Sequence, residues 1–247
     1  PGNLDFRTDY ARALMLVGAL DEADEQARRV LAEEPARGTA MNIRADVAEL
    51  SQQPERMVES LRQLIADAED PEVRARMRIR LGARLVVLHR KDAERWPITE
   101  AMDLYAAAIE VMPSYVPWQN QLAQIALLAR QPERARRLAE RILEEFNPRN
   151  QQALRTIFEV EMVQRNFDAA ERALDELYDS YQPENPYRDL DLARLEIQRG
   201  RYPQAMDALD RLEEAGRHAV FTLLYHGLTE SEWMALTSTR RLFEHLV

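Results

Sequence analysis

One sequence pattern returns at a nearly constant interval along the whole chain. Each copy has an aromatic residue or a proline, then a small residue, then an apolar helix-forming stretch, as in Asn166–Leu174 and Arg201–Leu209. The aligned position is occupied in turn by Ala23, Met57, Ala101, Ala135, Ala170, Ala205 and Thr239. The intervals between these positions are 34, 44, 34, 35, 35 and 34 residues. Such a period predicts stacked units, none of which can bury its apolar face alone.

Composition indicates that the repeating unit is helical. Only 7 of the 247 residues are glycine, so most strand-to-strand turns would lack their usual residue. Alanine, glutamate, arginine and leucine, which are strong helix formers, dominate the chain. Hydrophobic residues make up 46%, which is enough for a sizeable core. No apolar run approaches the ~20 residues that span a bilayer, so we expect no membrane span.

The period resembles that of the tetratricopeptide repeat (TPR) family over nearly the whole chain. Repeats of that family carry small residues at positions 8 and 20, bulky residues at 17 and 24, and often proline at 32. Position 8 here is Ala11, Ala45, Gly82, Ala123, Phe158, Ala193 and Gly227. The resemblance implies an all-α, right-handed TPR superhelix (an α-solenoid) of about seven helix-turn-helix repeats. Proline near position 32 should end the second helix of each pair, at Pro35, Pro71, Pro113, Pro148 and Pro183.

We interpret residues 1–247 as a single array. Its expected repeats are 4–37, 38–71, 75–115, 116–149, 151–184, 186–219 and a partial or degenerate 220–247. The long interval places an insertion near residues 90–97, where the first helix of the third repeat should run long. Trp96 is then either an exposed anchor or folded back over its own hairpin. Phe158 departs from the small-residue pattern, so we expect the fifth repeat to be splayed there.

Several kinds of chemistry find no support in the sequence. Cysteine is absent, which removes disulfides, thiolate zinc sites and cysteine nucleophiles. No phosphate-binding loop, dinucleotide fingerprint, zinc-protease motif or calcium loop is present. The four histidines, at 89, 218, 226 and 245, show no helical ligand spacing. We therefore predict no enzyme activity, no cofactor and no metal site.

Charge bears on the kind of partner. A formal net charge of −10 argues against nucleic acid. Residues 72–99 nevertheless hold eight basic and three acidic residues. The densest group is Arg74, Arg76, Arg78, Arg80 and Arg84. This group exceeds what a solvated helix face with internal ion pairs requires, so we expect it to steer a charged partner.

The family resemblance implies a partner-binding groove lined by positions 2, 5, 9, 12 and 13 of each first helix. The candidate groove residues are Arg12, Asn42, Arg76, Asn120, Gln124, Arg155, Glu159, Tyr187 and Arg194. The full set of groove positions also includes apolar residues such as Leu16, Ile79 and Val163, and such a mixture suits a peptide or protein. It does not match the Lys, Asn and Arg clamp with which chaperone-binding members of the family hold a carboxylate.

These features favour a non-enzymatic scaffold for protein–protein interaction, cut from a larger bacterial protein. The arginine-rich, cysteine-free character is similar to that of the periplasmic TPR regions of PelB-like exopolysaccharide export proteins. That similarity implies recruitment of a polysaccharide-modifying enzyme during biofilm export and a periplasmic location, with a cytoplasmic one as the alternative.

A second hypothesis concerns the end of the chain. The stretch Ala219–Leu228 resembles the first strand of polysaccharide deacetylases, so Phe221–Val247 would begin such a domain instead of a seventh repeat. Both ends of the chain also carry apolar residues without a polar capping helix, which predicts self-association through the terminal helices. These residues are Leu4, Phe6, Tyr10, Leu242, Phe243, Leu246 and Val247.

Overall fold

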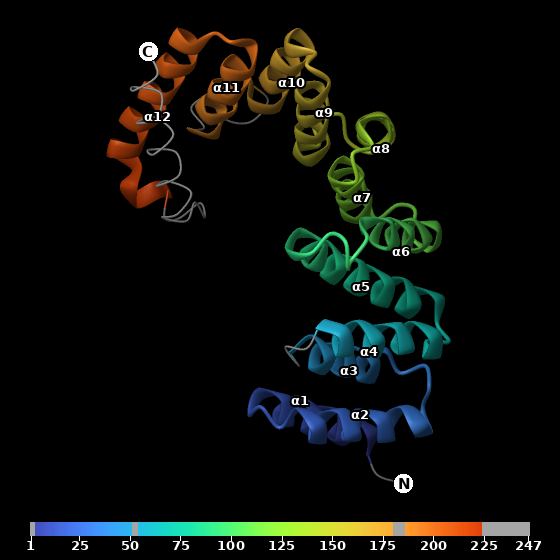
Figure 1. The fold of residues 1–247 in the computed structure, drawn as a ribbon. Coiled ribbons are helices and arrows are strands. Elements are labelled where there is room, and N and C mark those ends of the chain that lie inside the picture. The colour runs from blue at the N-terminus through green and yellow to red at the C-terminus, as the bar shows by residue number, and fades with distance from the viewer. Residues whose placement is uncertain (1–2, 51–53, 180–185, 224–247) are drawn as a thin grey trace. The chain divides into compact units, whose positions relative to one another are not determined.

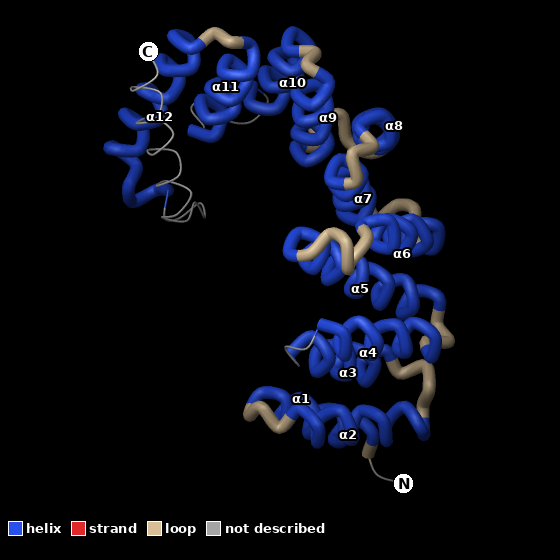
Figure 2. The backbone as a smooth tube through the Cα atoms, viewed as in Figure 1, coloured by secondary structure: helices blue, strands red, loops and turns tan. Residues whose placement is uncertain are grey.

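The computed structural model describes residues 3–50, 54–179 and 186–223, and these residues form twelve α-helices without a strand (Figures 1 and 2). The helices are α1 (Leu4–Leu16), α2 (Leu20–Glu33), α3 (Gly38–Leu50), α4 (Pro54–Asp67), α5 (Pro71–Lys91), α6 (Ile98–Val111), α7 (Val116–Leu128), α8 (Pro132–Glu145), α9 (Gln151–Gln164), α10 (Phe167–Asp179), α11 (Pro186–Arg199) and α12 (Tyr202–Leu223). The predicted all-α class is confirmed. Residues 224–247, which hold most of the expected seventh repeat, lie outside the described residues.

From α1 to α7 and from α9 to α12, each helix packs on the next one in the sequence. Paired helices such as α1 and α2, α5 and α6, and α9 and α10 contact each other, and the second helix of one pair contacts the first of the next. The chain divides into two compact units, residues 1–138 and 139–247, at a point inside α8. Each unit is described here by itself.

In the first unit, small residues lie where the helices of a pair approach each other. Ala11 of α1 and Ala23 of α2 are both fully buried. Gly82 of α5 makes the closest approach. A Cβ atom at this position would lie 2.8 Å from two ring carbons of Tyr105 in α6. The absence of a side chain at Gly82 therefore makes room for the buried ring of Tyr105.

In the second unit, Phe158 occupies the small-residue position without splaying the helices, so that expectation was wrong. Phe158 is fully buried in a cluster with Leu154, Ala170 and Leu174. Ala170 and Ala173 on α10 contribute little volume to this cluster. Small residues on the partner helix therefore compensate for the large ring on α9.

Polar caps and prolines mark several helix boundaries. The side chains of Asn3, Asp70 and Asn150 accept hydrogen bonds from backbone N–H groups in the first turns of α1, α5 and α9. Pro71 was expected to end a helix, but it lies in the first turn of α5, directly after the Asp70 cap. Proline is tolerated there because the first N–H groups of a helix have no partner within the helix.

The long interval in the sequence is explained by α5, which has 21 residues. As expected, this helix runs long before the turn. Trp96 in the turn is half-buried, and its carbonyl lies 2.8 Å from Nδ1 of His89 on α5. The guanidinium of Arg95 lies 5.5 Å from the centre of the Trp96 ring. The turn thus folds back onto its own hairpin.

The last described helix, α12, has 22 residues and passes through residue 219. Residues 219–223 are therefore helical, whereas the deacetylase hypothesis requires them to begin a strand. The rest of that stretch lies outside the described residues.

Replacing Gly82 by Val should destabilise the protein because the new side chain would overlap the Tyr105 ring. Overpacking of this kind costs about 1–3 kcal/mol. The matched control is Ala83→Val, one residue further along α5, where the side chain is exposed. Denaturant unfolding followed by circular dichroism would measure both. Equal losses for the two variants would contradict the close contact.

Replacing Phe158 by Ala should cost about 3–5 kcal/mol of unfolding free energy, as for a fully packed phenylalanine. The control is Phe146→Ala, because Phe146 is 37% exposed. If Phe158→Ala loses no more unfolding free energy than Phe146→Ala, the expectation of a splayed fifth repeat would be supported after all.

Candidate functional site

The first helix of each pair is called here an A helix and the second a B helix. The candidate groove residues of the first unit lie on the A helices α1, α3, α5 and α7. Arg12 is exposed and 3.3 Å from Asp9, and Arg76 is exposed and 3.3 Å from Glu72. Asn42 and Gln124 are exposed. Asn120, in contrast, is 3% exposed, so a partner could not reach its side chain without rearrangement.

A cluster of ion pairs joins α3 to α5 in the first unit. Nη2 of Arg80 lies 2.5 Å from Asp46, and Nε of Arg80 lies 3.0 Å from Glu49. Arg84 donates to the other carboxylate oxygen of Glu49 at 2.6 Å. Burial opposes the ionisation of Glu49, but the hydrogen bonds from Arg80 and Arg84 outweigh it and lower the pKa of Glu49. Glu49 is thus held as a carboxylate between two arginines.

The arginines of residues 74–84 do not form a group of unpaired side chains, although the expected steering of a charged partner stays a prediction. Besides Arg76, Arg80 and Arg84, which bind carboxylates, Arg74 donates to the carbonyl of Ala68 at 2.6 Å. Arg78 donates to the carbonyl of Ala107 at 3.3 Å. All five arginines therefore have partners within the array, and their charge is largely used for its own cohesion.

In the second unit, three candidates join α9 to α11. Arg155 forms an ion pair with Asp191, whose side chain is only 3% exposed. Arg194 donates to both carboxylate oxygens of Glu159, at 2.9 and 3.1 Å, and also lies 3.1 Å from Asp191. The fourth candidate, Tyr187, is half-buried and packs against the core around Phe158.

Tyr178 of α10 completes the polar network at Asp191. Its hydroxyl accepts a hydrogen bond from Nη2 of Arg155 at 2.6 Å and donates one to Asp191 at 2.8 Å. Burial and the neighbouring Asp191 raise the pKa of Tyr178, and Arg155 opposes this only in part. The hydroxyl therefore stays protonated and keeps donating to the carboxylate. Three side chains from three helices are joined in this way.

The two clusters share one spacing that links successive A helices. Asp46 and Arg80 are 34 residues apart, Glu49 and Arg84 are 35 apart, and Glu159 and Arg194 are also 35 apart. Arg80, Arg84 and Asp191 were not among the predicted groove residues. Opposite charges separated by one repeat length were the sequence signal that would have found them.

Exposed apolar side chains lie near the C-terminal ends of several A helices, and three of these helices, α3, α5 and α9, also carry the ion pairs described above. In the first unit Leu16, Leu50 and Val87 are 85%, 52% and 46% exposed. In the second unit Val163 is 64% exposed. A surface of satisfied ion pairs bordered by apolar side chains can bind a protein segment by burying the apolar groups.

Among the described residues, no group of three or more histidine, aspartate or glutamate side chains is arranged to hold a metal ion. None of the described helices combines the length and the apolar character that crossing a bilayer requires.

Replacing Tyr178 by Phe should destabilise the second unit by about 1–2 kcal/mol, because Asp191 and Arg155 both lose a hydrogen bond in a buried setting. The control is Tyr105→Phe, since the Tyr105 hydroxyl has no hydrogen-bond partner among the described residues. Denaturant unfolding at neutral pH would compare the two. Similar small losses would mean that the Tyr178 hydroxyl does not support the network.

Glu49 should make the first unit acid-sensitive. Its folded pKa is lowered, so its contribution is fully present above the unfolded value of about 4.3. The contribution is lost as the pH falls through the folded pKa. Glu49→Gln should cost about 1–2 kcal/mol at pH 7, and the difference from the natural chain should shrink in acid. Glu55→Gln, which removes an exposed pair with Arg95, serves as the control. A difference that is independent of pH would contradict the ion-pair assignment.

Comparisons with known proteins agree with this arrangement. The family model described as tetratricopeptide repeat matches residues 161–224. Among solved structures, a tetratricopeptide repeat protein from Parabacteroides merdae has a TM-score of 0.71 at 13% identity, covering 98% of this chain and 87% of that one. PilW, described as a widely conserved type IV pilus biogenesis factor, has a TM-score of 0.60 at 16% identity, covering 95% and 100%. PilF of Pseudomonas aeruginosa has a TM-score of 0.57 at 17% identity, covering 90% and 96%.

No curated protein matches the chain in sequence. At these identities the solved structures show the fold alone. The helix-turn-helix pairs and the similar structures together show that the chain has an all-α helical-repeat fold like that of tetratricopeptide repeat proteins, and residues 161–224 match the tetratricopeptide repeat model itself.

Proposed function

We propose that the chain is a non-enzymatic scaffold of a larger bacterial protein, and that its A-helix surfaces bind a protein partner. The observation that carries this proposal is the set of exposed apolar residues on α1, α3, α5 and α9, which on α3, α5 and α9 lie on the same helices as the satisfied ion pairs. An exposed leucine such as Leu16 or Leu50 gains free energy when a partner covers it. The neighbouring ion pairs can lie against polar groups at the edge of the partner's surface without first being broken.

The proposed setting is exopolysaccharide export, with a polysaccharide-modifying enzyme as the partner and the periplasm as the compartment. Support for it comes from sequence character: no cysteine, and arginine in place of lysine at all but one of the 33 basic positions. The alternative is a TPR region fused to the start of a polysaccharide deacetylase. The helical state of residues 219–223 weighs against that alternative.

Site-directed photo-crosslinking in cells that make the natural protein would test this proposal. A photoreactive amino acid is placed at Leu50 or Gln124 on A helices, and at Glu59 on the exposed surface of the B helix α4 as the control. We expect the A-helix positions to crosslink one extracytoplasmic enzyme that acts on polysaccharide, and the control position not to. Equal crosslinking from all three positions would overturn binding at the A helices. A cytoplasmic partner would overturn the export setting.

The first helix also supports the predicted self-association. Phe6 and Tyr10 are 70% and 46% exposed, and their rings stack with centres 6.5 Å apart. Sedimentation of the chain over a wide concentration range should show reversible association, because contact between copies would remove this apolar surface from water. The double variant Phe6→Glu, Tyr10→Glu should be monomeric, and Leu50→Glu is the control away from α1. Identical behaviour of all three proteins would rule out α1 as the contact.

A further inference from the structure

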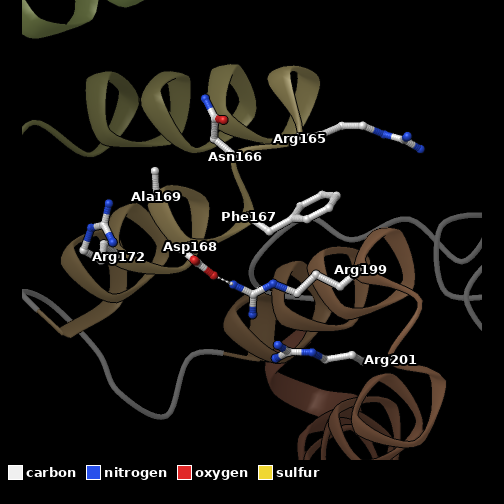
Figure 3. Close-up of a pocket in the computed structure, with 8 residues that line it drawn as sticks. All are labelled: Arg165, Asn166, Phe167, Asp168, Ala169, Arg172, Arg199 and Arg201. Carbon is white, nitrogen blue, oxygen red and sulfur yellow. Dashed lines mark hydrogen bonds and ion pairs between the residues drawn. The ribbon is translucent and has the colours of Figure 1, made fainter.

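A basic pocket lies in the second unit beside the turn between α9 and α10 and the turn between α11 and α12 (Figure 3). Its volume is about 640 Å³. Four arginines line it, with one acidic side chain and one aromatic ring among its other walls. They are Arg165, Arg172, Arg199, Arg201, Asp168 and Phe167. This concentration of positive charge is notable in a chain whose net charge is −10.

Arg199 forms the fixed part of the pocket. Its side chain is 5% exposed, and it lies 2.9 Å from Asp168, 2.8 Å from Glu171 and 3.0 Å from Glu196. Asp168 differs from the other two acids because it is 90% exposed. Figure 3 shows its carboxylate meeting the guanidinium of Arg199 at the pocket surface. The structure thus already contains a solvent-facing carboxylate bound at this position.

The other three arginines have fewer partners within the protein than Arg199 has. The closest acid to Arg201 is Glu196, at 3.8 Å, and one oxygen of Glu196 has no hydrogen-bond donor within the described residues. Arg165 and Arg172 form no hydrogen bond or ion pair with any described side chain. Arg165 extends away from the Asp168–Arg199 pair in Figure 3. Because exposed side chains change rotamer within nanoseconds, Arg165 can still turn toward a ligand.

The backbone conformation at Arg165 allows its side chain to be removed by a matched substitution. Four A–B turns place one residue in the left-handed region, and two of these residues are Gly18 and Gly200, with φ of 81° and 77°. The other two are Arg130 and Arg165, with φ of 56° and 60°. Glycine adopts this conformation without the steric cost that a side chain brings. Glycine could therefore replace Arg165, or Arg130 outside the pocket, and remove the side chain without straining the turn.

We infer that this pocket binds an acidic segment of a protein partner, with carboxylates at Arg165, Arg172 and Arg201 and an apolar residue against Phe167. Carboxylate is the chemistry already present on Arg199 through Asp168, and arginine binds carboxylates through paired hydrogen bonds. The half-buried Phe167 ring gives such a segment an apolar contact beside the charges. This inference deepens the proposed function, since the acidic segment belongs to the protein partner, but it uses the turns and not the A-helix surfaces.

The test measures binding of a fluorescein-labelled peptide of alternating aspartate and leucine to the full chain by fluorescence anisotropy. Arg165→Gly and Arg172→Gln should each weaken binding by about three- to tenfold, as expected for the loss of one exposed charge pair. Asp168→Asn should tighten binding by about threefold, because it removes the internal competitor and its repulsion. Raising the salt concentration should weaken binding of the natural chain.

The matched control is Arg130→Gly, which makes the same change at the same turn position but outside the pocket. It should leave peptide binding unchanged. The midpoint temperature of unfolding of both arginine-to-glycine variants should equal or exceed that of the natural chain. A loss of binding in Arg165→Gly alone therefore cannot come from unfolding.

Four results would overturn the inference. The first is that Arg165→Gly and Arg172→Gln both bind the peptide as tightly as the natural chain, and the second is that Arg130→Gly loses as much affinity as Arg165→Gly. The third is that a peptide with asparagine in place of aspartate binds equally well. The fourth is that inorganic phosphate displaces the peptide more than chloride does at equal ionic strength. The last would indicate a site for small anions instead of an acidic segment. None of these results depends on the crosslinking from A helices, so failure here and failure of the proposed function are distinguishable.

Discussion

The close approach of the two helices in each pair is the constraint on which the rest of the structure depends. A single amphipathic helix in this chain cannot shield its apolar face, so each A helix must lie directly against its B helix. Gly82 shows how little space remains between the paired helices, because even one added carbon would lie 2.8 Å from the Tyr105 ring. Phe158 satisfies the same constraint differently, with small residues on the partner helix making room for it.

Regular stacking of the pairs also organises the charges. Once the helices repeat every 34 or 35 residues, an acid on one A helix meets an arginine about one repeat away. The Glu49 and Asp191 clusters arise in this way, although their details differ. Glu49 is held by two arginines alone, whereas Asp191 also receives the hydroxyl of Tyr178. Charges used for cohesion are not available to a partner, which is why we propose that exposed apolar residues and arginines at the turns bind it.

The candidate site was accessible to sequence reasoning only in part. Family positions on the A helices placed Arg155, Glu159 and Arg194 in a partner-binding groove, which stays a prediction, whereas the structure shows that Arg194 is ion-paired with Glu159 and Arg155 with Asp191. They also included Asn120, whose side chain is buried. The basic pocket was missed altogether, because it joins two turns that are 35 residues apart and no short motif links them.

The sequence by itself determined the helical class, the repeat length, the small residues at the contacts between paired helices and the longer third repeat, because these depend on periodicity and on the size of single residues. Only the tertiary structure decided the rest. It showed that Phe158 packs fully, that Pro71 begins α5, and that the arginines of residues 74–84 are paired within the array. The physical reason is that packing and ion pairing depend on what lies opposite a side chain, and in a stacked array that neighbour is a whole repeat away in the sequence.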